Sequence, residues 1–227
     1  IYSVRESSIK EGLIWVGAND GPVHVTRDGG KTWNDVTPNK KIKGGRVDSV
    51  EPSRHKEGKA YVTVLRYQLG DWSPYIYKTN NYGKSWELIT DGIPSEFPVR
   101  VLREDPVREG LLFAGTEFGV FISMDDGENW TQFQNNMPVT PITDMKIHRN
   151  DLVLSTMGRS FWILDNIAPL RSYGNFQSQQ PLLDITDTYR FRYRSYSDDH
   201  VSYPSSAVDF DYIISHDDVE NVKISVY

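Results

Sequence analysis

One motif occurs three times in this 227-residue chain and limits what the chain can fold into. Each copy reads hydroxyl-x-Asp/Asn-x-Gly-x-polar-Trp, and the copies span residues 26–33, 79–86 and 123–130. An alternating apolar and polar run precedes each copy and another follows it, which is typical of two β-strands joined by a tight turn. The motif therefore predicts three β-hairpins.

The residue types in the motif explain the turn. Asp28, Asn81 and Asp125 can accept hydrogen bonds from backbone N–H groups inside their own turns. Because Asn81 is uncharged, hydrogen bonding matters more here than charge. The glycines supply the positive φ that such turns need, and the tryptophans open the next strand and bury a ring against a neighbouring sheet. The other motif residues are Thr26, Thr79, Ser123, Gly30, Gly83, Gly127, Trp33, Trp86 and Trp130. We interpret the motif as architectural, without chemistry of its own.

The spacing of the motif extends the prediction to the whole fold. The copies start roughly 50 residues apart, which is the period of a propeller blade rather than of a helical repeat. Four groups of strands fit along residues 1–165, and the fourth group, over 142–164, lacks the motif. We predict an all-β fold of about four β-propeller blades from a larger ring, with no helix. Residues 188–193 could return to form the outer strand of the fourth blade.

These stretches resemble the Asp-box, or BNR, repeat of sialidases, xyloglucan-cleaving glycosidases and sortilin (VPS10) propellers. The wider sequence, at 45–47, 115–120 and 158–165, is similar to large exported bacterial proteins of the sortilin-like or BNR-glycosidase-like type. The resemblance covers about residues 1–170 and implies the fold. It implies an activity only weakly, because one fold hosts many unrelated functions.

Composition narrows the class of partner. The net charge of −6 and the pI near 5.4 argue against nucleic acid or an anionic membrane as the main partner. No run of about 18 apolar residues exists, so we predict no membrane span. Cysteine is absent, which excludes disulfides, a thiol nucleophile and thiolate metal ligands. The five histidines lack ligand spacing, and we predict neither a metal nor a cofactor.

The ends of the chain suggest a piece of a longer protein. Residues 1–4 form a strand-like run with neither an initiator Met nor a signal peptide, so we expect a fragment or a processed product. We predict a linker over 166–193 and the start of a truncated β-sandwich, or a hairpin, over 194–227. Because four blades are near the lower limit for a closed ring, the expected partners are further blades of the same protein or of a companion chain.

Loops on one face of the blades are the candidate binding surface. The motif turns would share one face, and relatives with known activity keep their sites on the opposite one. The longest loop there, 67–75, combines aromatic rings with an acid, which suits a sugar or a peptide. Alternatively, Trp72 only covers the end of its blade. The candidate ligand-binding residues in these loops are Tyr67, Asp71, Trp72, Glu117 and Phe118.

Three arginines form a second candidate site. Arg46 and Arg100 take matching positions in the similar stretches 46–52 and 100–106, so both could point into the central channel. Arg159 lies in the corresponding hairpin of the fourth blade. Together they could hold a carboxylate bidentately. The alternative is that salt bridges occupy them, with partners among Glu51, Asp105 and Glu117.

We expect an exported ligand- or protein-binding module of sortilin-like type, secreted, periplasmic or at the cell surface. Its ligand would be a peptide, a glycan or a protein, and no catalytic residues are predicted in this chain. The alternative is a BNR-type glycoside hydrolase of the sialidase or xyloglucanase type. Asp20, Asp71 and Glu117 fall on the loop face, but no motif assigns them to the roles of acid and base or nucleophile. A hydrolase should show paired carboxylates in a cleft, whereas a binding module should show an aromatic or charged surface without them.

Overall fold

In a computed structural model, the structure describes residues 1–38, 44–173, 183, 185, 208 and 210–212. The chain divides into two compact units, Ile1–Asp165 and Asn166–Tyr227. The strand predicted at 188–193 and almost all of the predicted segment 194–227 lie outside the described residues.

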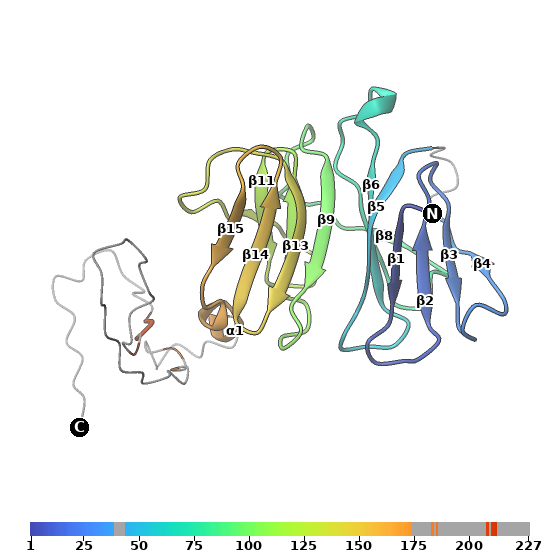
Figure 1. Ribbon diagram of the computed structural model, residues 1–227, viewed down its shortest axis with the longest axis horizontal. Helices are drawn as coiled ribbons and strands as arrows, with labels where there is room; N and C mark the ends of the chain where they lie inside the picture. The colour runs from blue at the N-terminus through green and yellow to red at the C-terminus, as the bar shows by residue number, and fades with distance from the viewer. Residues whose placement is uncertain (39–43, 174–182, 184, 186–207, 209, 213–227) are drawn as a thin grey trace, which may run out of the picture. The chain divides into compact units, whose positions relative to one another are not determined.

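Four antiparallel sheets follow one another along the first unit, and in each sheet the strand order is the sequence order (Figure 1). Blade 1 consists of β1 (Ser3–Glu6), β2 (Ile14–Gly17), β3 (Val23–Thr26) and β4 (Asn34–Asp35). Blade 2 consists of β5 (Arg46–Pro52), β6 (Ala60–Leu65), β7 (Ile76–Thr79) and β8 (Glu87–Leu88). Blade 3 consists of β9 (Val99–Glu104), β10 (Leu112–Thr116), β11 (Gly119–Ser123) and β12 (Thr131–Gln132). Blade 4 has three described strands, β13 (Ile142–His148), β14 (Asp151–Thr156) and β15 (Phe161–Leu164).

Two short helices correct the prediction that the chain has none. The 3₁₀-helix η1 (Tyr67–Leu69) lies in the loop 67–75 and ends at Gly70, whose φ of 78° is left-handed. The helix α1 (Ala168–Tyr173) lies in the second unit, within the predicted linker. Its first backbone N–H donates to the side chain of Asn166 at 3.3 Å, which is the i to i+2 bond of an Asx turn just before the helix.

The three motif turns form as predicted. In the first copy, the hydroxyl of Thr26 accepts a hydrogen bond from the Gly30 N–H at 2.9 Å, and Asp28 accepts one from the Thr32 N–H at 2.9 Å. Gly30 has a φ of 93°, as the turn requires. The same two backbone bonds recur in the second and third copies, with Asn81 in the place of Asp28 in the second.

We expect the first turn to weaken in acid. Hydrogen bonds from the side chain and the backbone N–H of Thr32 lower the pKa of Asp28 to about 2. A carboxyl with a lowered pKa stabilises the folded state above its unfolded pKa of about 4, and this contribution disappears as the pH falls towards 2. Asp28→Asn should remove this part of the acid sensitivity, because the amide keeps the acceptor, as Asn81 does. Urea unfolding between pH 5 and 2 measures the difference, and an Asp28 carboxyl that titrates near 4 by NMR would contradict it.

Two of the motif tryptophans join adjacent blades. Trp86 donates its indole N–H to the backbone oxygen of Val36 in blade 1 at 2.6 Å, and Trp130 donates to Ile89 in blade 2 at 2.9 Å. Trp130 is only 4% exposed. The burial predicted for Trp33 is wrong, since it is 45% exposed. Within the described chain, no sheet packs against that side of blade 1.

A buried ionic cluster also joins blades 2 and 3, on the face of the motif turns. The Lys59 ammonium lies 3.6 Å from Glu104 and 2.9 Å from Asp126, and the Tyr61 hydroxyl donates to the same two carboxylates at 3.1 and 2.5 Å. Burial disfavours the charge on Lys59, but hydrogen bonds to Asp126 and Glu109 more than offset this and raise its pKa. Burial, together with the nearby carboxylates, also raises the pKa of Tyr61. The cluster is structural, because its members bond to one another.

Candidate functional site

The inner strands of the blades line a cavity of about 680 Å³. Successive inner strands are in contact, β1 with β5, β5 with β9, and β9 with β13. The charged residues that line the cavity are Arg5, Arg46, Asp48, Arg100, Arg103 and Asp144. Four arginines thus face two carboxylates, in a chain whose net charge is −6. Two further carboxylates lie beside these arginines, that of Glu117 next to Arg100 and that of Glu51 next to Arg103.

In blades 2, 3 and 4, a break in strand register places one residue of the inner strand in this cavity. The pairing of the inner strand with its neighbour skips Asp48 in blade 2, Arg100 in blade 3 and Thr143 in blade 4. All three unpaired residues line the cavity. Such β-bulges re-aim side chains beside functional sites. Sequence reasoning missed Asp48 and Thr143, because no residue pattern marks a bulge in these strands.

The register corrects the predicted match between Arg46 and Arg100. Arg46 pairs with Leu65 in the ladder of blade 2, whereas Arg100 is an unpaired bulge residue. The residue of blade 2 that corresponds to Arg100 is Asp48, so the sequence alignment was wrong by two residues. The alignment relied on the identity of an arginine and a proline, but hydrogen-bond pairing sets the register.

The Arg46 guanidinium is occupied by its own strand. Its Nε and Nη2 atoms both donate to the carboxylate of Asp48, the latter at 3.0 Å. These hydrogen bonds raise the pKa of Arg46. The guanidinium also lies over the ring of Tyr2, 4.5 Å from its centroid. Arg46 therefore orients Asp48, and its Nε and Nη2 donors are already used, so this pair cannot form two parallel hydrogen bonds to a ligand.

Arg100 is held by charge rather than by hydrogen bonds. Its Nε lies 2.5 Å from Oε1 of Glu117, but the two groups are misaligned, and both buried atoms lack a hydrogen-bond partner within the described residues. Its Nη1 lies 3.9 Å from Asp48, beyond hydrogen-bond reach, and the Tyr67 ring is 5.8 Å away. The Nε atom is therefore a buried donor whose nearest carboxylate is not aligned to accept from it, an arrangement that is costly in proteins.

Arg103 also lines the cavity and was not predicted. Its guanidinium donates to the backbone oxygen of Met145 at 2.8 Å, the hydroxyl of Ser49 at 2.8 Å and the carboxylate of Asp144 at 2.5 Å. These partners belong to blades 2 and 4, while Arg103 belongs to blade 3. The side chain thus ties three inner strands together.

Arg159 does not join the other two predicted arginines. It is exposed in the loop between β14 and β15 and is not among the described residues that line the cavity. Its backbone oxygen accepts a hydrogen bond from the indole of Trp162 at 2.9 Å. The structure thus brings together Arg46 and Arg100 and leaves Arg159 apart.

The predicted loop residues divide into structural and exposed groups. Asp71 accepts hydrogen bonds from Arg66 and Tyr75, both at 2.8 Å, and although burial opposes its ionisation these bonds lower the pKa of Asp71 to about 2. It is therefore a poor general acid at neutral pH. Trp72 is exposed and packs on Tyr67 with ring centroids 5.7 Å apart.

In the third blade, the two predicted loop residues have neighbours of their own. Phe118 packs on Phe97 with centroids 4.7 Å apart, so its ring caps the blade. Glu117 contacts Arg100 as described above. This contact matches the salt-bridge alternative for Arg100, while its poor alignment leaves hydrogen-bonding capacity unused.

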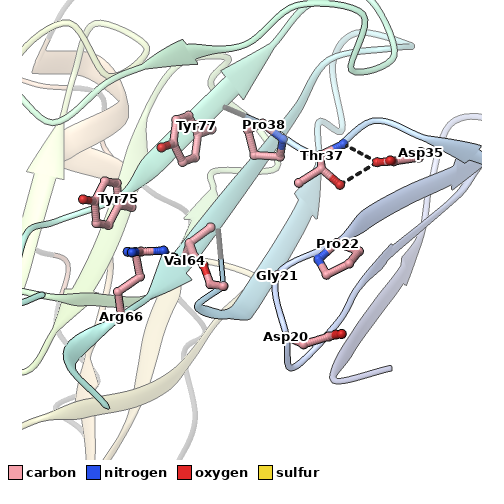
Figure 2. A pocket seen from close by; sticks show the side chains of 11 residues that line it. Asp20, Gly21, Pro22, Asp35, Thr37, Pro38, Val64, Arg66, Tyr75 and Tyr77 are labelled. Carbon is pink, nitrogen blue, oxygen red and sulfur yellow. Dashed lines mark hydrogen bonds between the residues drawn. The ribbon is translucent and has the colours of Figure 1, made fainter. Parts of the chain in front are cut away.

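A second, smaller pocket of about 300 Å³ lies between blades 1 and 2 (Figure 2). Tyr75 and Tyr77 form one side of it, with their rings stacked at 6.2 Å and 14°. Asp20 and Asp35 line the opposite side (Figure 2), and Asp35 accepts hydrogen bonds from the N–H and hydroxyl of Thr37 at 3.0 and 2.5 Å. Asp20 was a predicted acid. Tyr77 and Asp35 were missed because each lies inside a predicted strand.

Comparisons with known proteins identify the fold. No protein-family model and no curated protein matches the chain. Solved structures do match, among them YCF48 bound to D1 peptide, with a TM-score of 0.55 and 18% identity over 82% of this chain and 56% of that one. The GH74 xyloglucanase from Xanthomonas campestris matches with a TM-score of 0.56 and 11% identity, over 74% of this chain and 31% of the enzyme. The four sheets are arranged as β-propeller blades.

These likenesses confirm the predicted all-β propeller fold, and at such low identity they show the fold alone. A third match, the extracellular domain of BT3049 from B. thetaiotaomicron, has a TM-score of 0.53 and 16% identity over 72% of this chain and 20% of that one. None of these three structures is a sortilin. The chain spans 56% of the length of YCF48 and smaller shares of the other two.

Membrane-spanning helices and clusters of metal-binding side chains are absent from the described part of the chain. Among residues 1–38, 44–173 and the few described beyond them, no helix is long and apolar enough to cross a membrane. The same residues contain no group of three or more His, Cys, Asp or Glu side chains that could hold a metal ion.

Proposed function

We propose that this chain is part of an exported binding propeller and that its central cavity holds the C-terminal carboxylate of a peptide or protein ligand. One observation carries the proposal: Arg100 lines an arginine-rich cavity, and its contact with the Glu117 carboxylate is not aligned as a hydrogen bond. A carboxylate there could accept two parallel hydrogen bonds from the guanidinium. Met157 and Tyr67 would flank the ligand from the loops of blades 4 and 2.

Two further facts favour a peptide. The solved YCF48 structure, which shares this fold, contains a bound D1 peptide. In this chain, the exposed Trp72 and the neighbouring Tyr67 form an aromatic surface beside the arginine-rich cavity. A peptide is also one of the three kinds of ligand, with a glycan and a protein, that the sortilin resemblance implies. The exported location remains part of this proposal.

The test compares peptides that end in a free carboxylate with the same peptides carrying a C-terminal amide. A peptide library first selects binders to the intact natural protein, and calorimetry then measures their Kd. Arg100→Gln should weaken binding of the free-acid peptide by roughly 10- to 100-fold, because hydrogen bonds to charged groups contribute about 1.5–3 kcal/mol. The amidated peptide should bind weakly to both proteins.

Arg159→Gln is the matched control, since Arg159 is an exposed arginine that does not line the cavity. It should leave the Kd unchanged. Equal affinity for free-acid and amidated peptides, or equal effects of the two substitutions, would refute the carboxylate site.

A second candidate function is glycan binding or hydrolysis in the pocket between blades 1 and 2. The stacked Tyr75 and Tyr77 offer an aromatic side to a sugar ring, and Asp20 and Asp35 lie across from them (Figure 2). Release of reducing sugar from xyloglucan that is lost in Asp20→Asn would favour this function. A protein that binds the free-acid peptides and releases no sugar would favour the first.

A further inference from the structure

The contacts between blades repeat, and the repeat points to a partner for blade 1. In blade 2, a Cβ added to the motif glycine Gly83 would lie 2.6 Å from the side chain of Val36. In blade 3, a Cβ added to Gly127 would lie 2.4 Å from Ile89. In both blades the motif tryptophan donates its indole N–H to the backbone oxygen of that same residue. Glycine and tryptophan thus form a clamp on the residue that follows the outer strand of the preceding blade.

Blade 1 carries the same clamp without a residue inside it. Around Gly30, a Cβ would meet only the ring of Trp33, at 3.8 Å. Trp33 turns its indole N–H back to the oxygen of Gly30 at 3.1 Å. No residue of the described chain takes the place that Val36 and Ile89 occupy in the next two clamps.

The inner strand of blade 1 also carries an apolar side chain that is buried at the same position in blades 2 and 3 but exposed here. Val50 in blade 2 and Leu102 in blade 3 each lie opposite the third residue of the neighbouring strand and are 1% exposed. Each packs into the apolar cluster that it shares with the preceding blade. Val4 holds the same position in blade 1 and is 57% exposed. We call Val4, Gly30 and Trp33 the leading face.

We propose that the leading face docks another propeller blade of the same polypeptide, whose outer strand is followed by valine or isoleucine. The two filled clamps define this occupant. Each holds a β-branched aliphatic side chain, which leaves no room for a Cβ on the clamp's own glycine. The backbone oxygen of the held residue accepts the hydrogen bond from the indole N–H. In both filled clamps, the blade that supplies the held residue comes directly before the blade that carries the clamp in the same chain. The same arrangement at blade 1 favours a blade of the same polypeptide over a separate protein. The matched solved chains are also longer than the part that this chain covers. The proposal does not depend on the ligand of the central cavity.

Oxidative footprinting with mass spectrometry tests the proposal, with three tryptophans as reporters. In the 227-residue chain, Trp33 should be oxidised as fast as the exposed Trp72. In the intact natural protein, oxidation of Trp33 should fall to the rate of the buried Trp130. If Trp33 stays as reactive as Trp72 in the intact protein, the proposal is wrong. Protection of Trp33 in the 227-residue chain that grows with concentration would point to a second copy and would also overturn it.

A pair of valine substitutions separates docking from folding. Val4→Asp in the intact protein should restore oxidation of Trp33, because a buried carboxylate without a partner opposes docking. In the 227-residue chain the same change should leave the thermal midpoint unaltered, which shows that the blade still folds. Val107→Asp is the control, since Val107 is similarly exposed and lies outside the leading face. Continued protection of Trp33 in the Val4→Asp protein would argue against docking at this face.

Discussion

Replacing Trp130 with alanine is expected to lower the free energy of unfolding of this chain by about 3–5 kcal/mol. The side chain is buried between blades 2 and 3, where it belongs to the apolar cluster that also contains Tyr61 and Phe121. The substitution removes this packing and leaves the backbone oxygen of Ile89 without its indole donor. Urea unfolding of the 227-residue chain, followed by circular dichroism, measures the change.

Trp33→Ala in the same chain is the matched control. Its ring holds the same place in the motif but is half exposed, so the expected loss is less than about 1 kcal/mol. Similar losses for the two substitutions would show that the tryptophans stabilise their own turns and do not join blades.

Replacing Lys59 with methionine is expected to cost about 3–5 kcal/mol, because it leaves the buried carboxylate of Glu104 without its counter-ion. The Tyr61 hydroxyl and the backbone N–H groups of Arg54 and Gly110 would remain as its hydrogen-bond donors, and none of them carries the charge that Lys59 supplies. Chemical unfolding at pH 7 measures the loss.

A second substitution tests the cause. Glu104→Gln in the Lys59→Met background should recover part of the lost stability, since it removes the uncompensated charge. Lys56→Met, at an exposed lysine in the same turn region, should change the free energy of unfolding little. If the double variant is less stable than Lys59→Met alone, lost packing rather than lost charge explains the effect.

The parts of the fold that the sequence predicted are those set by local chemistry. The motif turns follow from a hydroxyl, an acceptor and a glycine at fixed spacing, and the alternation of apolar and polar residues predicted the strands on either side of each turn. The helix α1 was missed because its six residues are too few to show a helical period of apolar side chains.

The candidate site was harder to predict, because its geometry arises between strands. The bulges that turn Asp48 and Thr143 into the cavity are set by strand pairing and leave no mark in the residue pattern. The partners of Arg103 lie in blades 2 and 4, far from it in sequence. Aligning arginines by identity therefore found Arg100 but mismatched it with Arg46.

The hydrogen bonds of Arg103 also affect how rigid the cavity is before a ligand binds. One guanidinium fixes the spacing of Ser49 and Asp144, which lie on inner strands of blades 2 and 4. Two walls of the cavity are therefore in place before any ligand arrives, and their ordering entropy is lost during folding instead of on association. The cavity is accordingly expected to bind as a rigid receptor, with little backbone movement between its free and occupied states.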